Sequence, residues 1–383
     1  MKFVKYLTVI IIFTTVIGFN QNLFSWGLFN LFTDQSYTQE GLNAVEDFNP
    51  DKDILYLPQI GDKDIFESMD DLSICRKPEV RKFIFVYLTR GREYTIRSIE
   101  RSYLYKDIIS DIFKKEHDIP EEIALLPLLE SGFNPHAVSR SRAVGLWQFV
   151  SNTSKPLGLK NDRWIDERKD IEKSTEAAIR HLRHLYAMFN SWELALSAYN
   201  GGAGHVARAI KKTGTKNIWE LSKTGALSSE TSEYLCRFIA LVMIYKNQRL
   251  FDIYDEIMIP ETHKTETFIV KYPIKIKELS LVSGVPEETI ETYNPELNQS
   301  IIPPYYKNYS LRVPVEAKEK LRENEKELYR NKFSGVKKHR IRKGECLSLI
   351  AQHYKTNTRQ IMRFNGIRDP DNLKVGEILY IPF

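Results

Sequence analysis

The stretch ALLPLLESGFNPHAVSRSRAVGLWQFVSNTSKPLGLK, residues 124–160, indicates both the fold and the place of its chemistry. Ile123, Leu126 and Glu130 fall three and four residues apart, so Glu130 lies on the apolar stripe of a predicted helix. Burial disfavours a charged carboxylate, raises its pKa and leaves an acid that donates a proton near neutrality. Ser131 and Gly132 end the helix there, which places the side chain near a surface. The pattern makes Glu130 a candidate catalytic acid.

The helix that carries Glu130 has further signals at its start and in its middle. Asp118 is the expected N-cap, and Pro120 falls in the first turn, where its missing N–H costs little. Pro127 is expected inside the helix, where it would bend the last turn. By periodicity alone, an ordinary exposed or packing carboxylate is the alternative interpretation of Glu130.

Length and composition indicate a multidomain globular protein. The chain has 383 residues, of which 42% are hydrophobic and 27% charged, and its net charge is +5. We expect two or three domains and no nucleic-acid partner, because no cationic block dominates. Cys75, Cys236 and Cys346 lie too far apart for a CxxC metal site and are expected to be small buried hydrophobes.

The N-terminal part has the pattern of an exported protein. Lys2 and Lys5 precede the apolar run 7–19, so residues 1–27 are interpreted as a signal peptide, with an uncleaved membrane anchor as the alternative. The first cysteine after the run is Cys75, which excludes a lipoprotein. We therefore expect a periplasmic or envelope-associated protein, followed from 28 to 75 by an extended linker.

The rest of the chain divides into a helical part and a repeat. Residues 76–250 show apolar residues three and four apart, whereas short β-type runs appear afterwards. A shift of 71 residues aligns Ile276 with Leu347 and Asn294 with Asn365. Two copies of a βααβ unit are implied, at 263–316 and 336–383, and residues 317–335 are interpreted as a charged linker, a solvated helix or tether. The fold class is therefore mainly α.

The second copy resembles a LysM domain, a module that binds N-acetylated glycans. The resemblance includes Gly344, Leu347 and Asn365, and it implies that these residues take part in glycan binding. The first copy lacks the glycine after its first strand and carries an insertion, so it is interpreted as a degenerate LysM-like module. A packing module without a ligand is the alternative.

Four motifs occur in the helical part: Glu130-Ser131, Gly145-Leu146-Trp147-Gln148, Ala198-Tyr199-Asn200, and Glu230-Thr231 followed by Tyr234. In this order they resemble the catalytic domain of family 1 lytic transglycosylases. The resemblance implies a lysozyme-like, goose-type fold that cleaves the β-1,4 bond between N-acetylmuramic acid and N-acetylglucosamine in peptidoglycan. It implies that Glu130 is acid and then base, and that the product carries a 1,6-anhydro ring.

The resemblance also implies roles for the other motif residues. Tyr199 and Tyr234 would line the pocket and orient Glu130, while Ser131 and Gln148 would contact the sugar; the full set assigned to substrate binding is Ser131, Gln148, Trp147, Tyr199, Asn200 and Tyr234. No cofactor is expected. His181 and His184 lack a third ligand, so no metal is expected either. The expected partner is the peptidoglycan glycan strand, with membrane contact only through an N-terminal anchor.

Two alternatives stay open at this point. A goose-type lysozyme-like hydrolase would use a second acid, for which Asp162, Asp166 and Asp170 are candidates. Reducing sugar ends in the product would identify it, whereas anhydro ends identify a transglycosylase. An inactive peptidoglycan-binding scaffold is the other alternative, and the presence of all four motifs argues against it.

Overall fold

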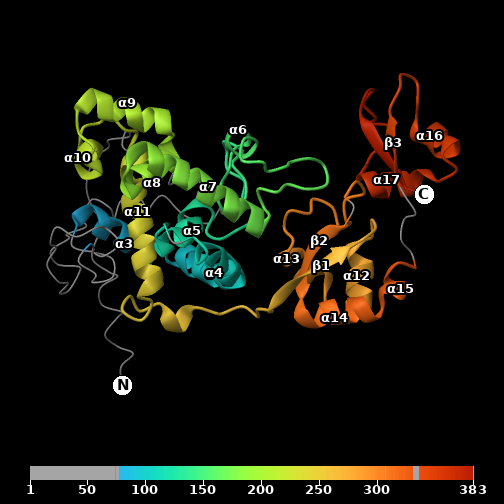
Figure 1. The fold of residues 1–383 in the computed structure, drawn as a ribbon, viewed down its shortest axis with the longest axis horizontal. Helices are drawn as coiled ribbons and strands as arrows, with labels where there is room; N and C mark the ends of the chain where they lie inside the picture. The colour runs from blue at the N-terminus through green and yellow to red at the C-terminus, as the bar shows by residue number, and fades with distance from the viewer. Residues whose placement is uncertain (1–73, 75–76, 117, 307, 331–335, 383) are drawn as a thin grey trace, which may run out of the picture.

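A computed structural model describes residues 74, 77–116, 118–306, 308–330 and 336–382 (Figure 1). The predicted signal peptide or anchor at 1–27 and nearly all of the predicted linker at 28–75 lie outside these residues. Within the described residues, no helix combines the length and the apolar character that crossing a membrane would require.

The helical body is built from short and medium helices joined by loops. Its elements are α3 (Pro78–Leu88), α4 (Arg92–Phe113), η4 (Glu121–Leu125), α5 (Leu126–Glu130), α6 (Ser151–Ser154), α7 (Ile171–Phe189), α8 (Trp192–Gly201), α9 (Ala203–Thr213), α10 (Ile218–Lys223), α11 (Ser229–Lys246) and η5 (Tyr254–Glu256). This confirms the predicted helical, lysozyme-like part of the fold.

Helix α11 forms the centre of this body. From Leu235 to Ile244 every residue is buried, because all of them except Arg237 are apolar, and Arg237 forms an ion pair with Glu233 at 2.8 Å. Helices α3, α5, α8 and α10 pack around it. Ser228 caps its first turn by accepting a hydrogen bond from the N–H of Thr231. The position of every surrounding helix therefore depends on α11.

The C-terminal part consists of two βααβ modules, as predicted from the repeat. The first contains β1 (Thr265–Val270), α12 (Ile276–Ser283), α13 (Glu287–Thr292) and β2 (Tyr309–Pro314), and the second contains β3 (Val336–Arg340), α16 (Leu347–His353), α17 (Thr358–Asn365) and β4 (Ile378–Pro382). In each module the two strands pair antiparallel, with Thr265 opposite Pro314 and Val336 opposite Pro382.

One buried asparagine holds each module together in the same way. The amide of Asn365 donates to the carbonyls of Ile361 and Tyr380, at 2.8 and 2.6 Å, and its oxygen accepts the N–H of Tyr380. Asn294 makes the equivalent bonds to Ile290 and Arg312 in the first module. The asparagine aligned by the 71-residue repeat therefore ties the last helix of each module to its last strand.

The segment predicted as a charged linker belongs in large part to the first module. Residues 315–328 form α14 (Val315–Glu323) and α15 (Glu325–Leu328), and their residues Ala317, Leu321 and Leu328 are buried in the core of that module. The segment is helical, which was one of the two interpretations, but the prediction that it is a solvated linker was wrong for these residues. The dense Lys and Glu pattern contains an apolar stripe at helical spacing, and that stripe packs on the first module.

The cysteines also differ in part from the prediction. Cys236 is buried in α11, as expected of a small hydrophobe, but Cys346 is exposed at the start of α16. Its sulfur lies 3.0 Å from the hydroxyl of Ser348.

A loop of the helical body contacts both C-terminal modules. Trp164, in the loop between α6 and α7, is buried, and its ring packs edge-on against Phe364 and Tyr380 of the second module, with 5.3 Å between ring centroids in each pair. The same loop is hydrogen-bonded to the backbone of the first module. The N–H of Asn298 donates to the carbonyl of Trp164, and the N–H of Asp166 donates to the carbonyl of Glu296, both at 2.8 Å.

An ion pair crosses this junction, close to a buried acid of the first module. Glu296 is buried, accepts a hydrogen bond from the Tyr309 hydroxyl, and has a pKa raised first by burial and then by the nearby charge of Asp170. Arg312 of the first module forms an ion pair with Glu172 of α7. The helical body and the modules are therefore joined by a specific interface and not only by the connecting chain.

We expect Asn365→Ala to destabilise the second module by about 2–4 kcal/mol, because it leaves a buried N–H and two carbonyls without partners. Denaturant unfolding followed by the NMR signals of that module measures the loss. Asn372→Ala is the matched control, since Asn372 is exposed in a loop of the same module. Equal stability of the two variants would contradict the role of Asn365.

We expect Trp164→Ala to loosen the junction, because removing a buried tryptophan costs about 3–5 kcal/mol of packing. Small-angle X-ray scattering of the full chain should then show a larger radius of gyration. Trp219→Ala, a half-buried tryptophan within the helical body, should leave the dimensions unchanged. An unchanged radius for Trp164→Ala would show that the docking does not depend on this ring.

Candidate active site

Glu130 is the last residue of a short composite helix. The 3₁₀ helix η4 covers Glu121–Leu125, and the α-helix α5 covers Leu126–Glu130. Pro127 lies in the first turn of α5, where no N–H donor is needed, so the predicted bend at an interior proline was wrong. Asp118 does not cap the helix either, because its carboxylate forms an ion pair with Arg183 of α7.

The carboxyl of Glu130 is bonded to the central helix of the body. It is half-buried and accepts a hydrogen bond from the hydroxyl of Tyr234, which stands on α11. Burial raises the pKa of Glu130 to about 7; the Tyr234 hydrogen bond opposes this rise, and the charge of Glu230 adds to it. A carboxyl with this pKa is partly protonated at neutral pH, as a general acid must be.

Tyr199 stands beside this pair at the C-terminal end of α8. Its hydroxyl donates to the carbonyl of Trp147 at 2.7 Å, and its ring packs near those of Phe149 and His181. Burial raises the pKa of both Tyr199 and Tyr234 well above 10, and the charge of Glu130 contributes. Both phenols therefore remain protonated donors next to the acid.

The loop at 145–149 is bonded to Ser131, next to Glu130, and is stabilised by a hydrogen bond within the loop. The Ser131 hydroxyl donates to the carbonyl of Leu146 at 3.0 Å, and the amide of Gln148 donates to the carbonyl of Gly145 at 2.8 Å. Gly145 has a φ of +86°, and a Cβ there would lie 2.0 Å from the carbonyl oxygen of Arg168. Only glycine fits this contact. Gln148 is half-buried in a loop fixed by these bonds.

Asn200 joins the third motif to the fourth. Its amide donates to Glu230 at 3.1 Å, and its oxygen accepts from the hydroxyl of Thr231 at 3.0 Å. These bonds hold the end of α8 against the start of α11. The structure thus brings together Glu130, Ser131, Gln148, Tyr199, Asn200 and Tyr234 from all four motifs.

Trp147 is not a substrate contact in this structure. Its side chain is 0% exposed, its N–H donates to Thr175 at 3.0 Å, and its ring stacks on Phe113 with centroids 6.1 Å apart. The assignment to substrate binding therefore needs correction. Trp147 is a core residue that supports the loop through its backbone carbonyl.

Two of the three residues expected to bind glycan in the second module are also core residues. Leu347 is buried in the module core, and Asn365 is 0% exposed with its side chain bonded to the backbone. Neither side chain is accessible to a ligand. Gly344 is exposed, with a φ of +87° and open space where a Cβ would lie, so it alone of the three lies at the surface.

Sequence reasoning missed two arginines that support the site. Arg101 of α4 donates to the carbonyl of Gly132 at 2.7 Å, directly after the motif that carries Glu130. Arg168 forms a buried ion pair with Asp166 and donates to the carbonyl of Phe149 at 3.2 Å. Nothing in the spacing of either residue pointed to this place, since both act on backbone far away in the chain.

The candidate second acids have structural partners. Asp162 accepts from the N–H of Trp164 at 2.7 Å, Asp166 pairs with Arg168, and Asp170 caps α7 by accepting from Lys173. In the part of the chain that the structure describes, no three His, Cys, Asp or Glu side chains could together hold a metal ion.

Three family matches cover the two parts of the fold. Residues 107–222 match the Transglycosylase SLT domain, residues 264–330 match the LysM-like domain of lytic transglycosylase MltD, and residues 339–382 match the LysM domain. The first match includes Glu130, the loop at 145–149 and Tyr199, and it ends before α11, which carries Tyr234. The second extends through α14 and α15, consistent with their packing on the first module.

Two curated proteins are similar in sequence to parts of this chain. The chain is 29% identical over 288 residues to membrane-bound lytic murein transglycosylase D of Escherichia coli (strain K12), which is 70% of this chain and 61% of that protein. It is 38% identical over 115 residues to a putative tributyltin chloride resistance protein of Alteromonas sp. (strain M-1), covering 30% of this chain and 54% of that protein. The chain thus spans about three fifths of the first relative.

We expect Tyr234→Phe to raise the pKa of Glu130 above about 7, because it removes the hydrogen bond that stabilises the charged carboxylate. The carboxyl carbon shift of Glu130, followed by NMR against pH, should show a midpoint at higher pH than in the wild type. Tyr186→Phe, on the half-buried face of α7, is the control. A midpoint that moves to lower pH would contradict this arrangement.

Proposed function

We propose that this chain, whose residues 107–222 match the Transglycosylase SLT domain, is a lytic murein transglycosylase that cleaves the β-1,4 bond between N-acetylmuramic acid and N-acetylglucosamine in peptidoglycan. The observation that carries the proposal is the half-buried Glu130, whose pKa is raised to about 7 inside the matched SLT domain. The reaction is non-hydrolytic and leaves 1,6-anhydro-N-acetylmuramic acid ends.

Glu130 acts first as acid and then as base. In the first step its proton moves to the glycosidic oxygen as the bond from that oxygen to the muramic C1 breaks. The resulting carboxylate then takes the proton of the muramic 6-hydroxyl as that oxygen bonds to C1. The acid is regenerated, and no water enters the product. Because the nucleophile belongs to the substrate, a second carboxylate is not required.

The partners of Glu130 support this cycle. Tyr234 donates to the carboxylate and stabilises it in the interval between the two proton transfers, while Tyr199 contributes a second neutral phenol nearby. The amide oxygen of Gln148 is suited to accept a hydrogen bond from an N-acetyl group, since only its nitrogen bonds the loop backbone, and Ser131 fixes the loop that carries Gln148. Asn200 supports the site by joining α8 to α11.

The structural partners of the other acids favour this reaction over hydrolysis. A hydrolase of this fold needs an acid that positions a water. Asp162, Asp166 and Asp170 are each occupied by backbone, arginine or capping bonds in the loop that docks the modules. A single acid next to two phenols fits the intramolecular reaction better.

We further propose that the chain is exported and works at the cell wall, with glycan strands bound by the second module. The support is the LysM match at 339–382 and the name of the E. coli relative, which describes it as membrane-bound.

We expect Glu130→Gln to lower the release of soluble muropeptides from sacculi by about 10²–10⁴-fold, because it removes the only proton donor in the proposed reaction. Glu121→Gln is the matched control, since Glu121 is exposed on the neighbouring turn. Mass spectrometry of wild-type products should find anhydro ends, each lighter by one water than a reducing end. Reducing ends would identify a hydrolase, and full activity of Glu130→Gln would remove this residue from the mechanism.

A further inference from the structure

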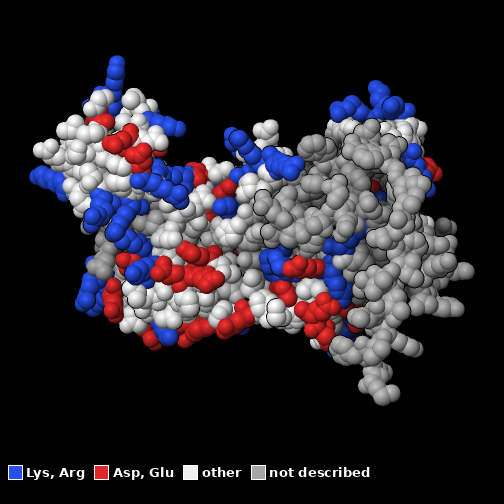
Figure 2. Space-filling view, turned by 180° about the vertical axis from the view of Figure 1, so that it is seen from behind, with Lys and Arg blue, Asp and Glu red and all other residues white. Residues whose placement is uncertain are grey.

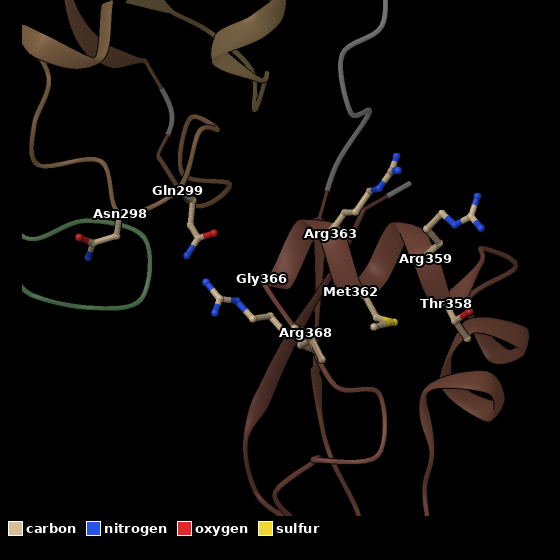
Figure 3. Close-up of a pocket in the computed structure, with 9 residues that line it drawn as sticks. Asn298, Gln299, Thr358, Arg359, Met362, Arg363, Gly366 and Arg368 are labelled. Carbon is tan, nitrogen blue, oxygen red and sulfur yellow. The ribbon is translucent and has the colours of Figure 1, made fainter. Parts of the chain in front are cut away.

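Two adjoining cavities lie between the modules and away from Glu130. They have volumes of about 640 and 580 Å³ and share the lining residues Gln299, Arg359 and Arg363, so we treat them together as the inter-module groove (Figure 3). Gln299 comes from the first module, whereas the arginines come from α17 of the second. The groove therefore exists only where the modules meet.

Residues of the docked junction form part of the groove walls. Ile301 and Phe364, which line it, are buried in the cluster that also contains Trp164 of the helical body. At its rim Gly366 lies close to Gln299, such that a Cβ on the glycine would be 3.0 Å from the amide oxygen. Preformed walls of this kind suit ligand binding, because the protein loses little conformational entropy when the ligand binds.

The groove carries positive charge without a compensating acid. Lys275, Arg359, Arg363 and Arg368 line it, and no Asp or Glu among the described residues does. Arg359 and Arg363 stand four residues apart on α17, where like charges repel, and within the described residues neither has an ion pair. Figure 3 shows these two extending from the same side of the helix, while Arg368 extends toward Gln299.

The whole second module shares this bias. Residues 336–383 contain ten Lys and Arg but four Asp and Glu, a net +6, whereas the complete chain has +5. The other 335 residues therefore carry a net −1. Figure 2 shows Lys and Arg gathered over the part of the surface at the upper left, and Asp and Glu along the lower edge. The second module, which contributes α17 to the groove, is therefore the basic part of the chain.

We infer that the inter-module groove binds the carboxylate-bearing peptide stems of peptidoglycan. Guanidinium groups form paired hydrogen bonds to carboxylates, and the Gln299 amide can bond to a peptide backbone. Met362 and Ile367 add apolar surface for short side chains. This mixture fits an acidic peptide better than a bare phosphate polymer. The inference rests on the proposed function, because it takes peptidoglycan as the polymer that presents the carboxylates.

The test uses the full chain and the peptide stem released from sacculi by an amidase. We expect the double variant Arg359→Gln/Arg363→Gln to bind this peptide at least about tenfold more weakly in calorimetric titration, since it loses two charge-assisted contacts. Lys275→Gln, on the opposite wall, should also weaken binding. The control Arg322→Gln/Lys326→Gln removes the same charge from α14 and α15 and should bind like wild type. Thermal unfolding confirms that each variant is folded.

Three results would overturn the inference. The first is that the double variant and the wild type bind the peptide with equal affinity. The second is that the wild type binds a peptide with amidated carboxyls as tightly as the unmodified peptide. The third is that inorganic polyphosphate displaces the bound peptide at a lower concentration than free peptide does. Failure of the proposed function is seen separately. The Glu130→Gln chain should bind the peptide normally, and the double variant should still cleave soluble glycan strands that lack peptides.

Discussion

The hydrogen bond from Tyr234 to Glu130 connects the acid of the proposed reaction to helix α11, in which every residue from Leu235 to Ile244 is buried. Glu130 stands at the end of a five-residue helix, which is too short to hold a side chain in place by itself. Helix α11 is fixed by the helices that surround it, and it presents Tyr234 to the carboxyl. The position and the raised pKa of the acid therefore follow from the packing of the whole helical body.

The prediction that Glu130 has a raised pKa rests on a physical reason. An ionisable residue on an apolar stripe signals burial, and burial is the first cause of the raised pKa of Glu130. The local details were harder to predict. Pro127 was taken for an interior kink because the change from η4 to α5 beside it leaves no mark in the apolar spacing. Asp118 resembled a cap but pairs with an arginine that is distant in the chain.

Motif residues turned out to be of two kinds. Glu130, Tyr199 and Tyr234 form the candidate site, whereas Trp147 supports the loop beside it, and Leu347 and Asn365 stabilise the core of the second module. A motif records residue types without distinguishing contact with a ligand from packing, so both kinds look alike in one sequence. The inter-module groove had no sequence signal at all. Its walls, Gln299 and Arg363, belong to different modules, and only the docking of Trp164 brings them together.

Docking through Trp164 also changes what the modules do for the enzyme. A flexible tether would let the catalytic part search a volume around each anchoring point on the wall. A body joined to its modules by a buried aromatic ring, backbone bonds and an ion pair has no such freedom. The distance along a glycan strand between the bond that is cleaved and the point where the modules bind would therefore be fixed.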